Sequence, residues 1–243
     1  MYSYKTIVDS LPAKKNSKSS LWVKTIVRKI SFPTTWIFIN CKCSPWLASM
    51  ISVFVAVIGS AFMCVNSELF RIIGVILIEF WLVLDCVDGN IARVKKQSSE
   101  YGEFVDALSG YYVTGFVFVG LGVAAYNTSI FLPENNLWYV ILGGITAVAG
   151  LLSRIIHQKF TYASMVISGS IDLIPEKEVS NKKSLQYLRS RLDKELGISG
   201  LFMPFLIVAC IFHLYDVMII FYLLFHAVGL VAVTLYYSLK AKR

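Results

Sequence analysis

The chain alternates long apolar segments with shorter charged ones. Six segments approach the length of about 20 mainly apolar residues that a helix needs to cross a membrane. They cover residues 45–65, 69–86, 104–126, 137–156, 198–214 and 216–239. The pattern predicts an all-α fold, an integral membrane bundle of six transmembrane helices.

A basic amphipathic segment precedes the first predicted span. From Leu21 to Ile30, apolar residues recur at helical spacing with three basic residues between them. This pattern is typical of a helix that lies on the membrane surface, and also of a short surface helix packed on the bundle. We divide the chain into a cytoplasmic N-terminal segment, residues 1–44, which holds this helix, and a transmembrane domain, residues 45–243.

The composition agrees with a membrane protein, and the distribution of charge predicts its orientation. Hydrophobic residues make up 56% and charged residues 16% of the chain, whereas soluble domains are about 25% charged. Of the 23 lysines and arginines, 22 fall in the connections predicted on one side, residues 1–44, 87–103, 154–197 and 240–243. Basic connections face the cytoplasm, so both termini are expected there. The net charge of +8 therefore requires no nucleic-acid partner.

Three aspartates lie where the second predicted span ends and the third begins. A charge at the bilayer centre costs about 2.5–3.5 kcal/mol, so carboxylates beside a span are functional candidates. Asp85 and Asp88 are three residues apart and share one helix face. Asp106 lies about one turn into the next helix at a similar depth. Two antiparallel helices with a short connection are expected to bring the three together at the cytoplasmic boundary.

Such a cluster favours a divalent cation. Carboxylate oxygens suit Mg²⁺ or Mn²⁺, and Mg²⁺ is typically held by one or two carboxylates together with substrate phosphates. The small residues Gly89, Ala92 and Gly102 let a ligand approach closely, and Arg93 suits a phosphate or a carboxylate. The alternative is that aspartates and glycines only cap helix ends. Three carboxylates at these intervals favour the metal site.

These residues resemble a known signature. The pattern Asp85-x2-Asp88-Gly89-x2-Ala92-Arg93-x8-Gly102-x3-Asp106 is similar to that of the CDP-alcohol phosphotransferase family, which makes membrane phospholipids. The resemblance implies a six-helix bundle with a two-metal site that opens to the cytoplasm. There an acceptor hydroxyl attacks the phosphorus that bears the alcohol, and CMP is released.

The resemblance also implies residue roles and partners. Asp85, Asp88 and Asp106 would be the metal-binding and catalytic residues, whereas Asp88, Gly89, Ala92, Arg93 and Gly102 would bind the cytidine and phosphate groups. The expected cofactor is Mg²⁺ or Mn²⁺. The expected partners are a CDP-alcohol donor similar to CDP-diacylglycerol, a hydroxyl acceptor and membrane lipids. A homodimer is expected by analogy, and the membrane is the cell membrane if the protein is bacterial.

The chain departs from the family pattern at Gly110. The family has a further aspartate four residues after the one at Asp106, which serves as second-metal ligand and proposed general base. Three explanations remain open. In the first, the enzyme is active and its site is completed by water, by an acidic group of the acceptor, or by a carboxylate such as Glu103 or Glu79. In the second, the chain binds CDP-lipid or metal without turnover. The third explanation is an engineered knockout.

Four further basic residues, and a second protein class, fit parts of the sequence pattern. Arg154 and His157 end the fourth predicted span, and Arg189 and Arg191 lie in the connection that follows. They are placed to contact a phosphate of the acceptor, or to hold anionic lipid headgroups. A small transporter explains the apolar helices but not the phosphate-binding pattern, and it predicts broken helices with sites at the membrane midplane.

Overall fold

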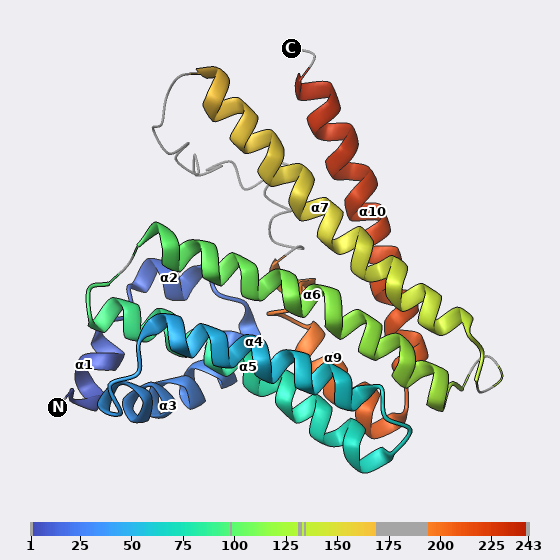
Figure 1. Ribbon diagram of the computed structural model, residues 1–243, viewed down its shortest axis with the longest axis horizontal. Coiled ribbons are helices and arrows are strands. Elements are labelled where there is room, and N and C mark those ends of the chain that lie inside the picture. Colours follow the sequence, from blue (N-terminus) through green and yellow to red (C-terminus); the bar gives the residue numbers. More distant parts are fainter. Residues whose placement is uncertain (1, 98, 131–132, 134, 169–193, 242–243) are drawn as a thin grey trace.

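The computed structural model describes residues 2–97, 99–130, 133, 135–168 and 194–241. Over these residues the chain forms helices and no strand (Figure 1). The helices are α1 (Tyr4–Asp9), α2 (Ala13–Lys18), the π-helix η1 (Val23–Val27), α3 (Arg28–Asn40), α4 (Pro45–Met63), α5 (Glu68–Val94), α6 (Glu100–Thr128), α7 (Trp138–Ser168), α9 (Phe202–Phe212) and α10 (Tyr215–Ala241).

Two helices that frame the site begin at serine caps. The Ser44 hydroxyl accepts a hydrogen bond from the Leu47 backbone N–H (3.1 Å), and Pro45 takes the first position of α4. The Ser99 hydroxyl accepts from the Gly102 backbone N–H (3.1 Å) at the start of α6. A serine cap satisfies a backbone donor that has no partner within the helix, and proline suits the first turn because it needs none. The local sequence therefore fixes where α4 and α6 begin.

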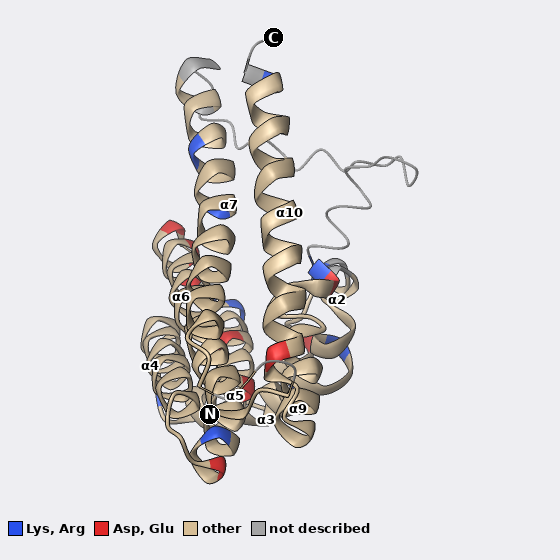
Figure 2. Ribbon diagram, turned by 90° about the vertical axis from the view of Figure 1, so that its right-hand side faces the viewer, with Lys and Arg blue, Asp and Glu red and all other residues tan. Residues whose placement is uncertain are grey.

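The helix α4 lies between α5 and α6. It packs against both α5 and α6, whereas α5 and α6 make little contact with each other. On the other side α6 packs against α7, and α7 packs against α10. The helices α7 and α10 lie side by side, carry few charged residues and project beyond the rest of the bundle (Figures 1 and 2).

A pair of glycines allows α6 and α7 to touch. A Cβ atom at Gly122 would lie 2.6 Å from the carbonyl oxygen of Tyr139, and one at Gly143 would lie 2.6 Å from that of Phe118. No side chain fits at such distances. Small residues at this crossing therefore bring the two backbones into contact, as is common between helices in membranes.

Within the described part of the chain, four helices are long and apolar enough to cross a membrane, by length and composition. They are Pro45–Met63, Glu100–Thr128, Trp138–Ser164 and Tyr215–Lys240. The 27-residue helix α5 is long enough, but Glu79, Asp85 and Asp88 lie within its apolar stretch. The 11 residues of α9 extend only about 16 Å, about half of the hydrocarbon core. The expectation of six spans therefore stays a prediction for α5 and α9.

The N-terminal helices pack against the bundle through one face. Val23 and Val27 are buried, and α3 packs along α5. The opposite side presents apolar side chains such as Leu21 (63% exposed) and Ile37 (54% exposed). The expected boundary at residue 44 falls in the turn between α3 and α4. A position of this segment on the membrane surface stays a prediction, and so does the domain division.

Candidate metal and phosphate site

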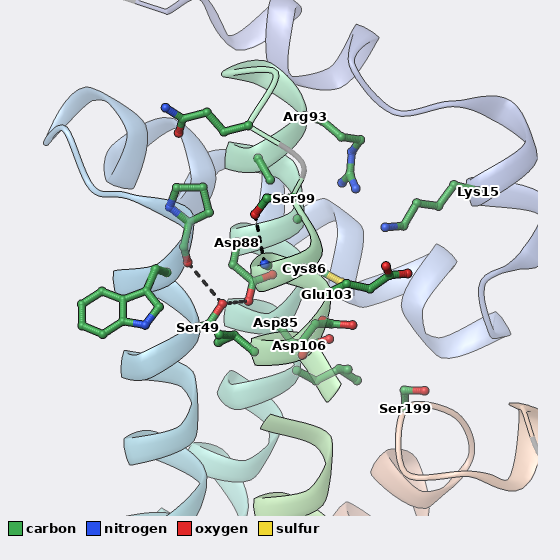
Figure 3. Close-up of a pocket in the computed structure, with 18 of the residues that line it drawn as sticks. Lys15, Ser49, Asp85, Cys86, Asp88, Arg93, Ser99, Glu103, Asp106 and Ser199 are labelled. Atoms are coloured by element: carbon green, nitrogen blue, oxygen red, sulfur yellow. Dashed lines mark hydrogen bonds between the residues drawn. The ribbon is translucent and has the colours of Figure 1, made fainter. Parts of the chain in front are cut away.

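The three aspartates meet at the junction of α5 and α6. One carboxylate oxygen each from Asp85, Asp88 and Asp106 lie within 4.8 Å of one another (Figure 3). Asp88 is buried, Asp85 is half-buried and Asp106 is exposed. Because α5 and α6 pack on α4 rather than on each other, the carboxylates converge only near the ends of their helices. The cluster expected from the spacing is therefore present, and its oxygens suit a divalent cation.

A serine of α4 holds the most buried of the three carboxylates. The Ser49 hydroxyl donates a hydrogen bond of 2.5 Å to Oδ2 of Asp88. One turn further along α4, Ser52 lies 3.4 Å from the hydroxyl of Ser109, which also accepts a hydrogen bond from Nε1 of Trp81 (3.1 Å). These contacts join α4, α5 and α6 in one buried polar layer, so the direction of the Asp88 carboxylate is set by a neighbouring helix.

The carboxylates lie at one wall of a cavity of about 900 Å³. This volume is at the upper end of the range for small-molecule sites. The ends of α4, α5 and α6 form one side of the cavity, and the N-terminal segment forms another through Lys15, Ser19 and Arg28. Lys194 and Ser199 complete the lining from the chain segment that precedes α9. The N-terminal segment therefore belongs to the site.

The guanidinium group of Arg93 is oriented by a chain of polar side chains. Its Nη2 donates to Oδ1 of Asn90 (2.5 Å), and Nδ2 of Asn90 donates to Oγ1 of Thr35 on α3 (2.9 Å). The Nε atom of Arg93 is buried and has no hydrogen-bond partner among the described residues. Because Arg93 also lines the cavity, its oriented guanidinium is suited to bind a phosphate oxygen.

Two more cations come from the N-terminal segment. Arg28 is buried, donates to Oγ of Ser19 (2.9 Å) and keeps an Nε atom without a partner among the described residues. Lys15 of α2 points into the cavity toward the carboxylates (Figure 3). Burial and the charge of Arg93 lower the pKa of Lys15, while Asp106 acts in the opposite direction. Lys15, Arg28 and Arg93 thus give the cavity a positive side that faces its negative one.

The small residues of the motif line the same cavity. A Cβ atom at Gly89 would lie 3.3 Å from Nη1 of Arg93, so the missing side chain leaves room for the guanidinium. At Gly102 the nearest neighbour of such an atom is the Ser99 hydroxyl at 3.5 Å, an ordinary contact. Ala92 is also part of the lining. The protein itself excludes no side chain at Gly102, so the close approach expected there would be that of a ligand.

The space over Gly110 is taken by an arginine. A Cβ atom at Gly110 would lie 2.9 Å from Nη1 of Arg154 on α7, and no other described neighbour outside its own helix comes within 4 Å. The guanidinium of Arg154 also lies 5.9 Å from the centre of the Tyr111 ring. Neither Glu79 nor Glu103 fills this space. A cation therefore stands at the position where the family pattern places a carboxylate.

The other residues singled out from the sequence differ in whether they line the cavity. Glu103 lines the cavity, whereas Oε2 of Glu79 accepts a hydrogen bond from Nε1 of Trp22 (3.2 Å) away from it. Nδ1 of His157 is hydrogen-bonded to the hydroxyl of Tyr237 on α10. Arg189 and Arg191 lie outside the described residues.

Sequence reasoning missed several residues of this site, namely Lys15, Arg28, Ser49, Asn90 and Thr35. Only Ser49 carried a signal, because it shares one face of α4 with Ser52 and Ser60 within an otherwise apolar helix. Lys15 and Arg28 reach the cavity, and Thr35 reaches Asn90, through tertiary packing, which local spacing does not reveal.

Comparison with known proteins agrees with the geometry. The family model for CDP-alcohol phosphatidyltransferase matches residues 45–174, just over half of the chain. The match begins at the first residue of α4 and contains the three aspartates and Arg93. No curated protein matches the chain. The chain belongs to the CDP-alcohol phosphatidyltransferase family.

Proposed function

We propose that the protein transfers a phosphatidyl group from a CDP-alcohol similar to CDP-diacylglycerol to an acceptor hydroxyl, with release of CMP. Family membership makes it a membrane transferase of phosphorus-containing groups in lipid biosynthesis. One observation carries the finer assignment. Across a single cavity, the carboxylates of Asp85, Asp88 and Asp106 face a basic side made by the N-terminal segment and Arg93.

The carboxylates fit the divalent cation that the family uses. Three carboxylate oxygens within 4.8 Å repel one another unless a cation lies between them, and oxygen ligands of this kind suit Mg²⁺ or Mn²⁺. Asp85, Asp88 and Asp106 would hold it. When bound, such a cation neutralises charge on the phosphoryl oxygens and on the departing CMP.

The basic side chains would hold the diphosphate of the donor. Arg93 and Arg28 both line the cavity, and charge-assisted hydrogen bonds to phosphate are among the stronger ones in proteins. Lys15 adds a third positive charge above the carboxylates. In this arrangement the cytidine lies toward Gly102, where a small residue leaves room, while Gly89 makes room for the guanidinium of Arg93.

Transfer then requires one bond to form and one to break. The acceptor oxygen bonds to the phosphorus that bears the alcohol, and the bond from that phosphorus to the CMP oxygen breaks. The hydroxyl proton needs a base, since Gly110 supplies none. We assign the proton to the carboxylate of Glu103, because it lines the cavity and Glu79 does not.

The test is CMP release by the purified full chain. With CDP-diacylglycerol, Mg²⁺ or Mn²⁺ and a panel of hydroxyl acceptors, the protein is expected to release CMP, and a chelator is expected to stop it. Asp85→Asn should abolish release, while Asp9→Asn, which changes an exposed carboxylate on α1, serves as the matched control. Release that persists unchanged in Asp85→Asn would refute the assignment.

Gly110 supports a second candidate function, in which the chain binds CDP-lipid and metal without turnover. Under this alternative, Mn²⁺-dependent binding of CDP-diacylglycerol is retained but no CMP appears with any acceptor. The expectation that the termini and the site face the cytoplasm, and that the protein forms a homodimer, goes with either function. Both remain predictions.

A further inference from the structure

We propose that the site holds a single divalent ion and that the guanidinium of Arg154 supplies the positive charge of a second one. The inference rests on the metal site of the proposed function. It starts from the pairing of Gly110 with Arg154, in which Nη1 lies 2.9 Å from the position of a Cβ atom.

The pair of Gly110 and Arg154 lies close to Asp106 along α6. Gly110 lies one helical turn after Asp106 on α6, about 6 Å further along the helix axis. The guanidinium reaches it from α7, the helix that packs on the other side of α6 from α4. A cation therefore lies one turn beyond Asp106 on α6, at the position where the family pattern has its last aspartate.

Among the described residues, Arg154 has no charged partner. It lies within the candidate span Trp138–Ser164, where an ionised side chain is costly unless it is paired. No carboxylate in the described part of the chain forms an ion pair with it, and its guanidinium lies 5.9 Å from the centre of the Tyr111 ring. An arginine in such a helix is a functional candidate by default.

The number of converging carboxylates supports a single ion. Asp85, Asp88 and Asp106 bring one oxygen each within 4.8 Å of the others, and the family's fourth carboxylate is missing at Gly110, where the guanidinium of Arg154 stands. A second ion beside Arg154 would place two cations together with no carboxylate between them.

The pairing also predicts that restoring the aspartate alone is insufficient. A carboxylate placed at Gly110 would lie against Nη1 of Arg154 and form an ion pair with it. It would then be unavailable as a metal ligand. Two changes are needed to recreate a second site, one that adds the carboxylate and one that removes the guanidinium.

The experiment counts metal ions. Mn²⁺ is titrated into the purified full chain with CDP, the bound ions are counted by calorimetry, and electron paramagnetic resonance reports coupling between neighbouring Mn²⁺ ions. One ion without such coupling is expected for the wild type, for Gly110→Asp and for Gly110→Ala, a control that adds a side chain without charge. Two coupled ions are expected for the double variant Gly110→Asp, Arg154→Gln.

The outcomes separate this inference from the proposed function. Two ions in the wild type, or in Gly110→Asp alone, would overturn the inference and leave the metal-dependent function standing. No bound Mn²⁺ in the wild type would overturn the metal site itself. The wild-type count needs no variant, so a substitution that fails to fold does not decide the matter. If the double variant folds and still binds one ion, the inference is also overturned.

Discussion

Removing the hydroxyl of Ser49 should weaken metal binding without touching a metal ligand. Ser49 donates to Oδ2 of Asp88 at 2.5 Å, and Asp88 is only 6% exposed, so water does not easily replace the lost donor. A hydrogen bond to a charged group contributes about 1.5–3 kcal/mol, and loss of a group that orients a ligand typically costs roughly 10–100-fold in metal affinity. We expect Ser49→Ala to raise the Kd for Mn²⁺ by about this factor.

The assay is titration of Mn²⁺ into the purified protein, with free Mn²⁺ followed by electron paramagnetic resonance. Ser60→Ala is the matched control, because Ser60 is equally buried on α4 but donates only to the carbonyl of Ala56. It lies about 16 Å from Ser49 along the helix. An unchanged Kd in Ser49→Ala, or an equal loss in Ser60→Ala, would show that the Asp88 carboxylate does not depend on this hydrogen bond.

Two further predictions concern the cavity. Lys15→Gln should weaken CDP binding about tenfold or more through loss of a charged contact to phosphate, while Lys5→Gln on the exposed face of α1 leaves it unchanged. Because burial and Arg93 lower the pKa of Lys15, its charge is lost as pH rises through a value below the usual 10.5, so CDP affinity should fall there. Lys15→Arg should move that fall to higher pH. Glu103→Gln should slow CMP release by roughly 10²–10⁴-fold in single-turnover measurements. Glu79→Gln, which disturbs the hydrogen bond to Trp22, should change the melting temperature more than the rate of CMP release. Equal effects of the two variants on that rate would show that Glu103 is not the base.

The aspartate cluster was predictable because its information is local. Asp85 and Asp88 share a face by spacing alone, and the short connection to α6 brings Asp106 to the same depth. Long apolar runs likewise predicted the four helices that qualify as spans. Periodicity and spacing within one or two neighbouring helices are enough for such features.

The basic side of the cavity was not predictable in the same way. Lys15 and Arg28 come from helices about 60 residues or more before Asp88 in the sequence, and they reach the cavity only because α3 packs along α5. The relation of Arg154 to Gly110 depends on how α7 lies across α6, which is set by the glycine contact between Gly122 and Gly143. Single-sequence patterns do not determine such crossings.

The most direct test of the central claim follows the phosphate itself. CDP-diacylglycerol carrying radioactive phosphate at the phosphorus next to the diacylglycerol is incubated with the protein, Mn²⁺ and hydroxyl acceptors. The account predicts that the label moves into a new lipid formed with an acceptor, that the released CMP is unlabelled, and that Asp85→Asn stops both. Label that appears in CMP, or only in the product of hydrolysis whichever acceptor is present, would contradict transfer to an acceptor hydroxyl.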